Sequence, residues 1–238
     1  MKKRAFLLAL ALCLSALAGC QREPVETTVF AMDTVMNLTL YGGWDREKTK
    51  ETRDWMTQRL TDCDELFSAA EGNGDIARVN QGAGQPVEVK NPTAELLSQA
   101  LELCEVTGGA LDITACPAVK AWGFTREEHR VPSPAELEEL ARRIDYAAVE
   151  LEGNTVTLPE GMELDLGGVA KGYVGDRLAD TARADGISSA LLDLGQSTIV
   201  AVGTKPGGRP WRIGVVDPAR PGAYFAVVEL QDMAMGTS

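Results

Sequence analysis

Apolar and polar residues alternate along two short segments near the start of the chain, Val25 to Phe30 and Thr34 to Tyr41. This period of two is typical of half-buried β-strands, so we expect two strands that flank Ala31-Met32-Asp33. From about Asp45 to Phe67 the apolar residues recur at helical spacing instead, which predicts an amphipathic helix. Its expected core-facing side chains are Met56, Leu60, Cys63 and Phe67.

A second helical pattern runs from about Thr93 to Thr107 and places Leu97, Leu101 and Cys104 on one side. Gly108-Gly109 follows it directly. Glycine adopts the left-handed conformation of a helix C-terminus at little cost, so this pair is expected to end the helix. The residues after it are predicted to form a loop.

In the second half of the chain, helices and strands do not alternate regularly. Ser133 is expected to begin a helix, since Glu136 three positions later completes a capping box, and another helix is expected from Lys171 to about Ala184. The predicted strands are Ala147 to Leu151, Thr155 to Leu158, Ala190 to Leu194, Ile199 to Val202, Trp211 to Val216 and Tyr224 to Leu230. This order predicts an α+β fold with a largely antiparallel sheet in one domain.

The N-terminus has the pattern of a bacterial lipoprotein signal. Lys2, Lys3 and Arg4 precede an apolar run from Ala5 to Ala18, which is too short to span a membrane. Leu17-Ala18-Gly19-Cys20 resembles a lipobox. We therefore expect residues 1–19 to be a signal peptide, Cys20 to be lipidated, and residues 20–238 to be tethered to a membrane in the cell envelope, on the extracytoplasmic side.

Charge and cysteine content exclude some classes of partner. The formal net charge of −12 becomes −15 without Lys2, Lys3 and Arg4, so nucleic acid is not an expected partner. Removal of the signal and lipidation of Cys20 would leave three cysteines, and an odd number does not form a disulfide framework. No Cys-x-x-Cys or paired-His zinc pattern is present.

The stretch from Leu164 to Tyr173 carries the most informative chemistry. It reads Leu-Asp-Leu-Gly-Gly-Val-Ala-Lys-Gly-Tyr, in which a carboxylate ends an expected strand, two glycines turn, and a lysine lies inside the next helix. Backbone N–H groups at the helix start, together with Lys171, favour a phosphorylated ligand. Asp165 would repel a bare phosphate, so either it contacts a neutral part of the ligand or a divalent cation bridges the two. The turn therefore indicates a nucleotide bound with a metal.

This turn matches neither common phosphate-loop pattern. Lys171 precedes Gly172 where a P-loop needs the lysine after the closing glycine, and Val169 stands where a dinucleotide fingerprint needs its second glycine. The alternative interpretation is an ordinary glycine-rich turn with a solvated lysine.

Three other segments are candidates for the same site. Gly108 to Pro117, continuing to Trp122-Gly123-Phe124, is a long loop that could line a pocket or simply cap a helix. Met32 between the first two strands could form a bulge whose thioether packs on a flat ring, or could belong to the core. Asp75 to Asn80 predicts a short helix with local side-chain bonds.

In their order along the chain, these segments resemble the ApbE family of FAD:protein FMN transferases. Met32-Asp33-Thr34 looks like the family's Met-Gly-Thr element, and Asp75 to Asn80 resembles its Ser-Glu-Ile-Ser-Arg-x-Asn helix. Gly109 to Thr114 resembles Gly-Gly-x-Phe-Asp-x-Thr. Asp165 to Tyr173 resembles Asp-Leu-Gly-Gly-Ile-Ala-Lys-Gly-Tyr, and Trp211 to Pro218 resembles Trp-x-Ile-Gly-Ile-x-Asp-Pro.

The resemblance implies an ApbE-type, T-fold-like α+β core and a flavin site. The residues that it places around FAD are Met32, Ala110, Leu111, Asp112, Asp165 and Lys171. It also implies Mg²⁺ near the Gly168 carbonyl and transfer of FMN from FAD to a threonine or serine of an exported flavoprotein. An Mg²⁺-dependent FAD pyrophosphatase and a flavin-binding lipoprotein without catalysis remain alternatives.

The sequence departs from the family pattern at three places. Ala70 stands about where many relatives carry an aromatic residue, and Gln196-Ser197 replaces a second Gly-Gly-x run after Leu194. The family pattern continues beyond Ser238 with a His-x-x-Asp-Pro element and a metal-binding Asp and Thr, so we expect a domain that is incomplete at its C-terminus. No catalytic residue is assigned, and His129 is expected to be solvated.

Overall fold

The computed structural model describes residues 23–43, 45–70, 72–124 and 129–237. The first half contains β1 (Val25–Ala31), β2 (Thr34–Leu40), α2 (Arg46–Phe67), α3 (Asp75–Gln81), β3 (Val87–Glu88), α4 (Asn91–Val106) and α5 (Cys116–Trp122). The second half contains α6 (Pro134–Ala141), the 3₁₀ turn η1 (Tyr146–Ala148), β4 (Glu150–Glu152), β5 (Thr155–Thr157), α7 (Ala170–Ala184), β6 (Ser189–Asp193), β7 (Thr198–Gly203), β8 (Trp211–Val216), β9 (Tyr224–Leu230) and β10 (Met233–Gly236). The expected α+β class with antiparallel sheets is confirmed. Cys20 and the expected signal peptide lie outside the described residues.

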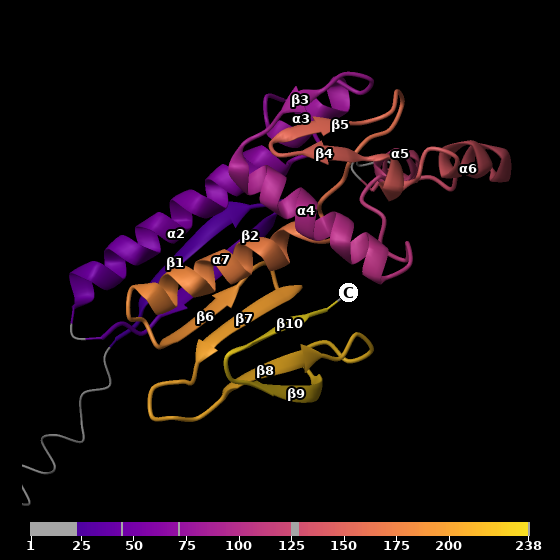
Figure 1. Ribbon diagram of the computed structural model, residues 1–238. Coiled ribbons are helices and arrows are strands. Elements are labelled where there is room, and N and C mark those ends of the chain that lie inside the picture. Colours follow the sequence, from indigo (N-terminus) through magenta and orange to yellow (C-terminus); the bar gives the residue numbers. More distant parts are fainter. Residues whose placement is uncertain (1–22, 44, 71, 125–128, 238) are drawn as a thin grey trace, which may run out of the picture.

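A five-stranded sheet in the order β1-β2-β6-β7-β10 forms the centre of the molecule (Figure 1), and every neighbouring pair in it is antiparallel. Helices α2 and α7 lie side by side across one face, where α2 packs on β1 and α7 packs on β7. The core-facing side chains expected on α2 are buried, with Met56 and Leu60 at 0% exposure.

Strand β7 is apolar along nearly its whole length because both of its faces are covered. Val200 and Val202 belong to the main core under the helices, whereas Ile199 and Ala201 belong to a second apolar cluster. That cluster includes Trp211 at the start of β8, so the β8-β9 hairpin covers the other face of β7.

A smaller sheet in the order β3-β5-β4 lies with α3 and α4 at one end of the molecule (Figure 1). A buried carboxylate joins the two helices: Asp75, the first residue of α3, is only 1% exposed. The Asp75 carboxylate accepts a hydrogen bond from the Thr93 hydroxyl at 2.7 Å and one from the Lys90 backbone N–H at 2.7 Å. Arg78 pairs with its other oxygen at 2.5 Å. These contacts fix α3 against the start of α4.

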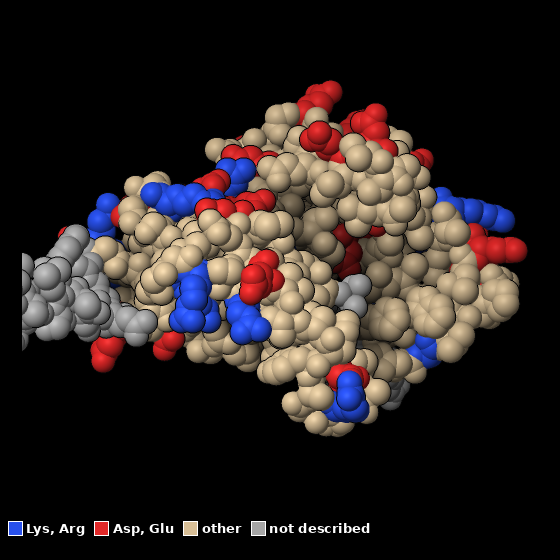
Figure 2. Space-filling view, turned by 90° about the horizontal axis from the view of Figure 1, so that it is seen from below, with Lys and Arg blue, Asp and Glu red and all other residues tan. Residues whose placement is uncertain are grey.

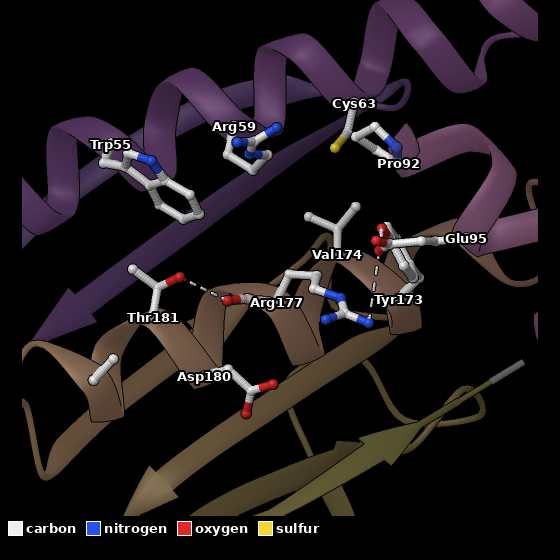
Figure 3. A pocket seen from close by; sticks show the side chains of 11 residues that line it. Trp55, Arg59, Cys63, Pro92, Glu95, Tyr173, Val174, Arg177, Asp180 and Thr181 are labelled. Carbon is white, nitrogen blue, oxygen red and sulfur yellow. Dashed lines mark hydrogen bonds and ion pairs between the residues drawn. The ribbon is translucent and has the colours of Figure 1, made fainter. Parts of the chain in front are cut away.

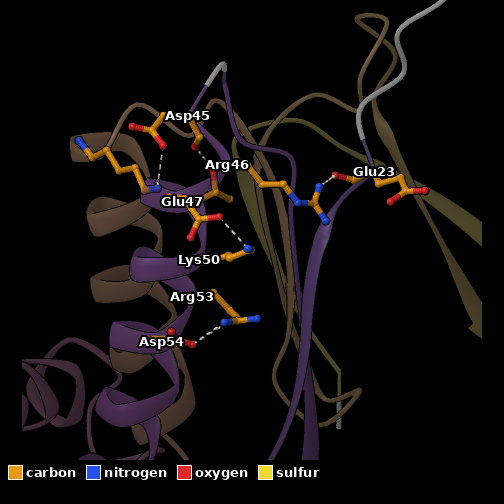
Figure 4. A network of polar contacts seen from close by, with 9 residues as sticks. Glu23, Asp45, Arg46, Glu47, Lys50, Arg53 and Asp54 are labelled. Carbon is orange, nitrogen blue, oxygen red and sulfur yellow. Dashed lines mark hydrogen bonds and ion pairs between the residues drawn. The ribbon is translucent and has the colours of Figure 1, made fainter.

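The outer end of α2 carries a chain of charged contacts (Figure 4). Asp45 caps the helix by accepting a bond from the Lys48 N–H at 3.0 Å, and Lys50 pairs with Glu47 at 2.7 Å. Arg46 donates to the Glu23 carbonyl at 3.0 Å and so ties the helix to the residues before β1. Among the described helices, none is long and apolar enough to cross a membrane.

The structure corrects several local expectations. The residues between β1 and β2 form a two-residue turn and not a bulge, since Ala31 pairs with Thr34 and both Met32 and Asp33 have positive φ, 50° and 58°. Only one half of the predicted capping box forms: Ser133 accepts from the Glu136 N–H, but the Glu136 carboxylate pairs with Arg130.

Two corrections concern strands. The expected strand before Asp165 is an extended segment with a single bridge, between Ala115 and Glu163. Strand β10 was not predicted, because Met233-Ala234-Met235-Gly236 has no alternating pattern of polar and apolar residues. Its partner is β7, and this pairing adds the last strand to the central sheet.

Candidate functional site

The start of α7 has the features expected of an anion site. The N-cap residue is Val169, which has no side chain able to cap the helix. Within the described residues, no hydrogen bond engages the backbone N–H of Lys171 or Gly172, or the carbonyl oxygen of Gly168. The N-terminal N–H groups and the helix dipole therefore face outward without a side-chain partner, as at helix N-termini that bind phosphate.

Asp165 lies just before this turn and is held by its neighbours. Its N–H donates to the Ile113 carbonyl at 2.8 Å, and one carboxylate oxygen, Oδ1, accepts from the Gly167 N–H at 2.7 Å. Leu164 and Leu166 on either side are fully buried. Because alternate residues of an extended segment point in opposite directions, burial of the two leucines turns the half-buried Asp165 toward the other side. Its second oxygen has no hydrogen-bond partner within the described part of the chain.

Lys171 in the first turn of α7 reaches toward the loop between β6 and β7. Its Nζ lies 3.4 Å from Ser197 Oγ, and the side chain is half-buried. The loop forms although Gln196 replaces a glycine of the family pattern. Gln196 has a positive φ of 64°, and its N–H donates to Asp193 Oδ1 at 2.7 Å, which holds that turn.

Asp112 has a structural role in the loop after α4. Its Oδ1 accepts from the Thr114 N–H at 2.8 Å and the Thr114 hydroxyl at 2.6 Å, and its Oδ2 accepts from the Tyr146 N–H at 3.1 Å. Both carboxylate oxygens are therefore engaged, and they join the loop to η1. The neighbouring Ala110 is exposed. Leu111 Cδ1 lies 3.9 Å from the position of a Cβ on Gly168, so this loop borders the α7 turn.

Met32 occupies the β1-β2 turn at the same end of the sheet. Its N–H donates to Asp64 Oδ1 of α2 at 2.8 Å, and its half-buried side chain packs against the main core. Thr34 at the end of this turn touches Gly195 of the β6-β7 loop, where a Cβ would lie 2.3 Å from Thr34 Cγ2. Contacts between neighbouring segments therefore connect the Met32 turn to the Lys171 helix, and that helix to the Leu111 loop.

Figure 2 shows a hollow in the lower face of the molecule, with acidic side-chain atoms at its floor. The C-terminal end of the described chain borders the β6-β7 loop, since the Thr237 N–H donates to the Ser197 carbonyl at 2.8 Å. Ser197 and Thr237 are candidate site residues that the sequence analysis did not select, because an isolated hydroxyl residue in a turn carries no distinctive pattern. Within the described residues, no three His, Cys, Asp or Glu side chains come together in a way that could hold a metal.

A separate cavity of about 400 Å³ lies between α2, α4 and α7 (Figure 3). The guanidinium carbon of Arg59 lies 5.0 Å from the centroid of the Trp55 ring. The Tyr173 hydroxyl donates a hydrogen bond to the Glu95 carboxylate at 2.9 Å. Burial beside Glu95 raises the pKa of Tyr173 to about 12. None of the site residues predicted from the sequence lines this cavity.

His129, Ala70 and the three cysteines form no hydrogen bond with Asp165 or Lys171 in the described part of the chain. His129 is exposed as expected, and its Nδ1 contacts the Gly123 carbonyl at 3.1 Å. The three cysteines in the described residues are buried and form no disulfide. Ala70 is exposed, and its N–H donates to Ser68 Oγ at 3.2 Å.

The fold is of the α+β class with antiparallel sheets, and α7 begins without a side-chain cap at a glycine-rich turn between two loops. The chain belongs to the ApbE family, whose model matches residues 32–238.

Individual relatives agree with this assignment. The chain is 29% identical to a FAD:protein FMN transferase of Haemophilus influenzae, over 98% of this chain and 70% of that protein. It is 30% identical to a FAD:protein FMN transferase of Vibrio cholerae, over 99% of this chain and 72% of that protein. Among solved structures, the ApbE protein of Thermotoga maritima matches with a TM-score of 0.81 at 28% identity. The match covers 89% of this chain and 69% of that one. The structure of the flavin transferase ApbE of Vibrio cholerae matches with a TM-score of 0.78 at 28% identity, and the match covers 89% of this chain and 70% of that one.

Proposed function

We propose that this protein is a FAD:protein FMN transferase, which moves FMN from FAD to the hydroxyl group of a threonine or serine on an exported flavoprotein. The observation that carries the proposal is the turn from Asp165 to Lys171, whose free N–H groups and lysine suit the diphosphate of FAD. Membership of the ApbE family and similarity to two FAD:protein FMN transferases support the same activity.

The reaction exchanges one phosphorus–oxygen bond for another. The acceptor hydroxyl oxygen forms a new bond to the phosphorus of the FMN half of FAD, and its proton passes to solvent or to a base. The pyrophosphate bond breaks, and AMP leaves with the bridging oxygen. Charge builds up on the transferred phosphoryl group and on the leaving phosphate, so catalysis depends mainly on positioning and electrostatic stabilisation.

Several residues of this chain would supply those effects. Lys171 and the N–H groups at the start of α7 would hold the diphosphate, where fixed donors stabilise negative charge without reorganisation. The Met32 turn and the loop at Ala110, Leu111 and Asp112 would border the rings and the ribose. Asp112 would act mainly by fixing this loop, since both of its oxygens already accept hydrogen bonds.

The residues at the turn also fit Mg²⁺ as a partner of the diphosphate. Mg²⁺ prefers oxygen ligands and in phosphate sites takes one or two carboxylates, with water and substrate phosphates completing its shell. The Gly168 carbonyl and the second oxygen of Asp165 are oxygen atoms without a hydrogen-bond partner among the described residues. When bound there, the ion would neutralise charge on the diphosphate and lower the pKa of the attacking hydroxyl.

The test combines binding with product analysis. FAD is titrated against the purified protein with and without Mg²⁺, and the protein is then incubated with FAD and a threonine-bearing acceptor. We expect Mg²⁺ to tighten binding and the acceptor to gain the mass of one FMN group. Free FMN and AMP with an unmodified acceptor would instead indicate a pyrophosphatase, and FAD binding that is insensitive to Mg²⁺ and without product would indicate a flavin-binding lipoprotein. Absence of FAD binding under both conditions would contradict the proposal.

We also propose that the protein is anchored to a membrane through a lipid on Cys20, on the extracytoplasmic side of the bacterial cell envelope. Support comes from the basic residues, the apolar run and the small residues before Cys20. Mass spectrometry of the N-terminal peptide should find a diacylglycerol on Cys20. Cys20→Ser should remove the lipid, and the protein should then be lost from the membrane fraction. An unmodified Cys20 in membrane-bound protein would contradict the anchor.

A further inference from the structure

The side chain of Asn80 forms two hydrogen bonds with the backbone of one distant residue. Its Nδ2 donates to the Leu164 carbonyl at 3.0 Å, and its Oδ1 accepts from the Leu164 N–H at 2.7 Å. The two residues are 84 positions apart in the sequence. This pair of bonds copies the exchange that a residue makes with its opposite partner in an antiparallel ladder. The amide group therefore takes the place of a neighbouring strand for Leu164.

The position of this clamp matters because Leu164 directly precedes Asp165. The Asp165 N–H is itself fixed by the Ile113 carbonyl at 2.8 Å, and Leu166 on its far side is fully buried. Asn80 sets the rotation of the peptide units on both sides of Leu164. Because side chains of an extended segment alternate in direction, that rotation decides where the Asp165 carboxylate points.

The base of the clamp is rigid. Asn80 lies on α3, and α3 is fixed at its first residue by the buried Asp75. Thr93 and the Lys90 N–H, both at the start of α4, donate to the Asp75 carboxylate at 2.7 Å each. The short helix is thus held at one end by α4, while the Asn80 side chain at its other end holds the segment before the α7 turn.

We propose that Asn80 is a positioning residue for the ligand-binding turn from Asp165 to Lys171. This inference rests on the proposed function, because it assigns Asn80 to the orientation of Asp165 toward the diphosphate and its metal. Groups that orient a ligand-holding side chain without touching the ligand commonly contribute about 10-fold to 100-fold in affinity or activity.

The variants separate positioning from stability. Asn80→Ala removes both hydrogen bonds to Leu164. Asn80→Asp keeps an acceptor for the Leu164 N–H but places a second acceptor against the Leu164 carbonyl, and it replaces Asn80→Ala in every measurement if that protein does not fold. The matched control is Thr52→Val, which removes the hydrogen bond from the buried Thr52 to Asp185, the residue that follows α7, and leaves α3 and Leu164 untouched.

The experiment measures thermal unfolding, FAD affinity with Mg²⁺, and amide hydrogen exchange on the full chain in detergent solution. We expect both Asn80→Ala and Thr52→Val to lower the melting temperature. Only Asn80→Ala should weaken FAD binding about tenfold and speed exchange at Leu164 and Gly167. Affinity and exchange that match those of Thr52→Val would overturn the inference.

A failure of the proposed function can be distinguished from a failure of the inference about Asn80. If the unaltered protein binds no FAD, that function fails, and amide exchange alone then tests the clamp. Faster exchange from Leu164 to Gly167 in Asn80→Ala than in Thr52→Val would still support positioning of the turn. Equal exchange in the two variants would contradict it.

Discussion

Gly195 and Thr34 are in direct contact, although they belong to two different turns. A Cβ on Gly195 would lie 2.3 Å from Thr34 Cγ2 and 2.6 Å from its Oγ1, and the φ of Gly195 is +86°. Thr34 begins β2 after the Met32 turn, and Gly195 belongs to the β6-β7 loop, whose Ser197 contacts Lys171. The close approach of these two turns therefore links the Met32 side of the site to the lysine side.

Gly195→Ala is expected to destabilise the protein for two reasons. A non-glycine residue in the left-handed region costs about 1–2 kcal/mol, and a side chain forced into an occupied space costs about 1–3 kcal/mol more. We expect the free energy of unfolding to fall by about 2–5 kcal/mol in denaturant titrations. The control is Gly207→Ala, because Gly207 has a similar φ of +93° but nothing within 4 Å of its Cβ position. Equal losses in the two variants would show that the contact with Thr34 is unimportant.

Lys171→Gln is expected to weaken FAD binding with little effect on folding. A hydrogen bond to a charged group contributes about 1.5–3 kcal/mol, which corresponds to a tenfold or larger increase in Kd. Lys171→Arg should retain more affinity, because the positive charge is kept. Fluorescence titration of FAD measures the change. Lys50→Gln is the control, since Lys50 pairs with Glu47 at the outer end of α2. Unchanged affinity in Lys171→Gln would remove this lysine from the site.

Asp112→Asn is expected to loosen the loop that borders the α7 turn. The amide can accept at only one of the two positions where the carboxylate now receives bonds from Thr114 and Tyr146. A buried donor left without its acceptor costs about 1–3 kcal/mol, so the melting temperature should fall. Thermal unfolding with and without FAD checks this. A variant of normal stability that fails to bind FAD would mean that Asp112 contacts the ligand directly and that its loop bonds are secondary.

Much of the fold follows from local patterns in the sequence. The alternation in β1 and β2 and the helical period of α2 each indicate burial of one face, and the apolar run of β7 fits burial of both faces. The structure has strands and a helix at these segments. The turn at the start of α7 was also predicted, because two glycines lie between an acid and a lysine, a pattern that fits either a phosphate site or an ordinary glycine-rich turn. These signals are local, and they depend only on nearby residues.

The remaining features depend on partners far apart in the sequence. Asn80 gives no local sign of its bonds to Leu164, because a polar residue in a short helix is common. Ser197 becomes a neighbour of Lys171 only after β6 and β7 pair. Strand β10 lacks an apolar alternation because its side chains are mostly exposed, so backbone pairing with β7 alone defines it.

The three cysteines of the described chain should be unreactive in the folded protein. Burial raises the pKa of Cys63 to about 11 and that of Cys116 to about 12, and burial also raises the pKa of Cys104. The thiolate is the reactive form, so little of it exists at pH 8. Peptide-resolved alkylation should show labelling at these positions only after unfolding in urea. Rapid labelling of Cys116 in folded protein would contradict the buried position that the structure gives it.

Asp75 should make stability depend on acid pH in a defined direction. Burial alone would raise the pKa of its carboxyl, but hydrogen bonds from Thr93, the Lys90 N–H and Arg78 outweigh burial and lower the pKa below the usual 3.8. A group whose pKa is lower in the folded state stabilises the protein above its unfolded-state pKa and loses that contribution as the pH falls through the folded-state value. Asp75→Asn should therefore be less stable than the unaltered protein at pH 7, and the difference should shrink as the pH falls below 3.8. Urea titrations of both proteins at several pH values measure the difference. A difference that stays constant from neutral to strongly acid pH would mean that the charge of Asp75 contributes nothing and that only the shape of its side chain matters.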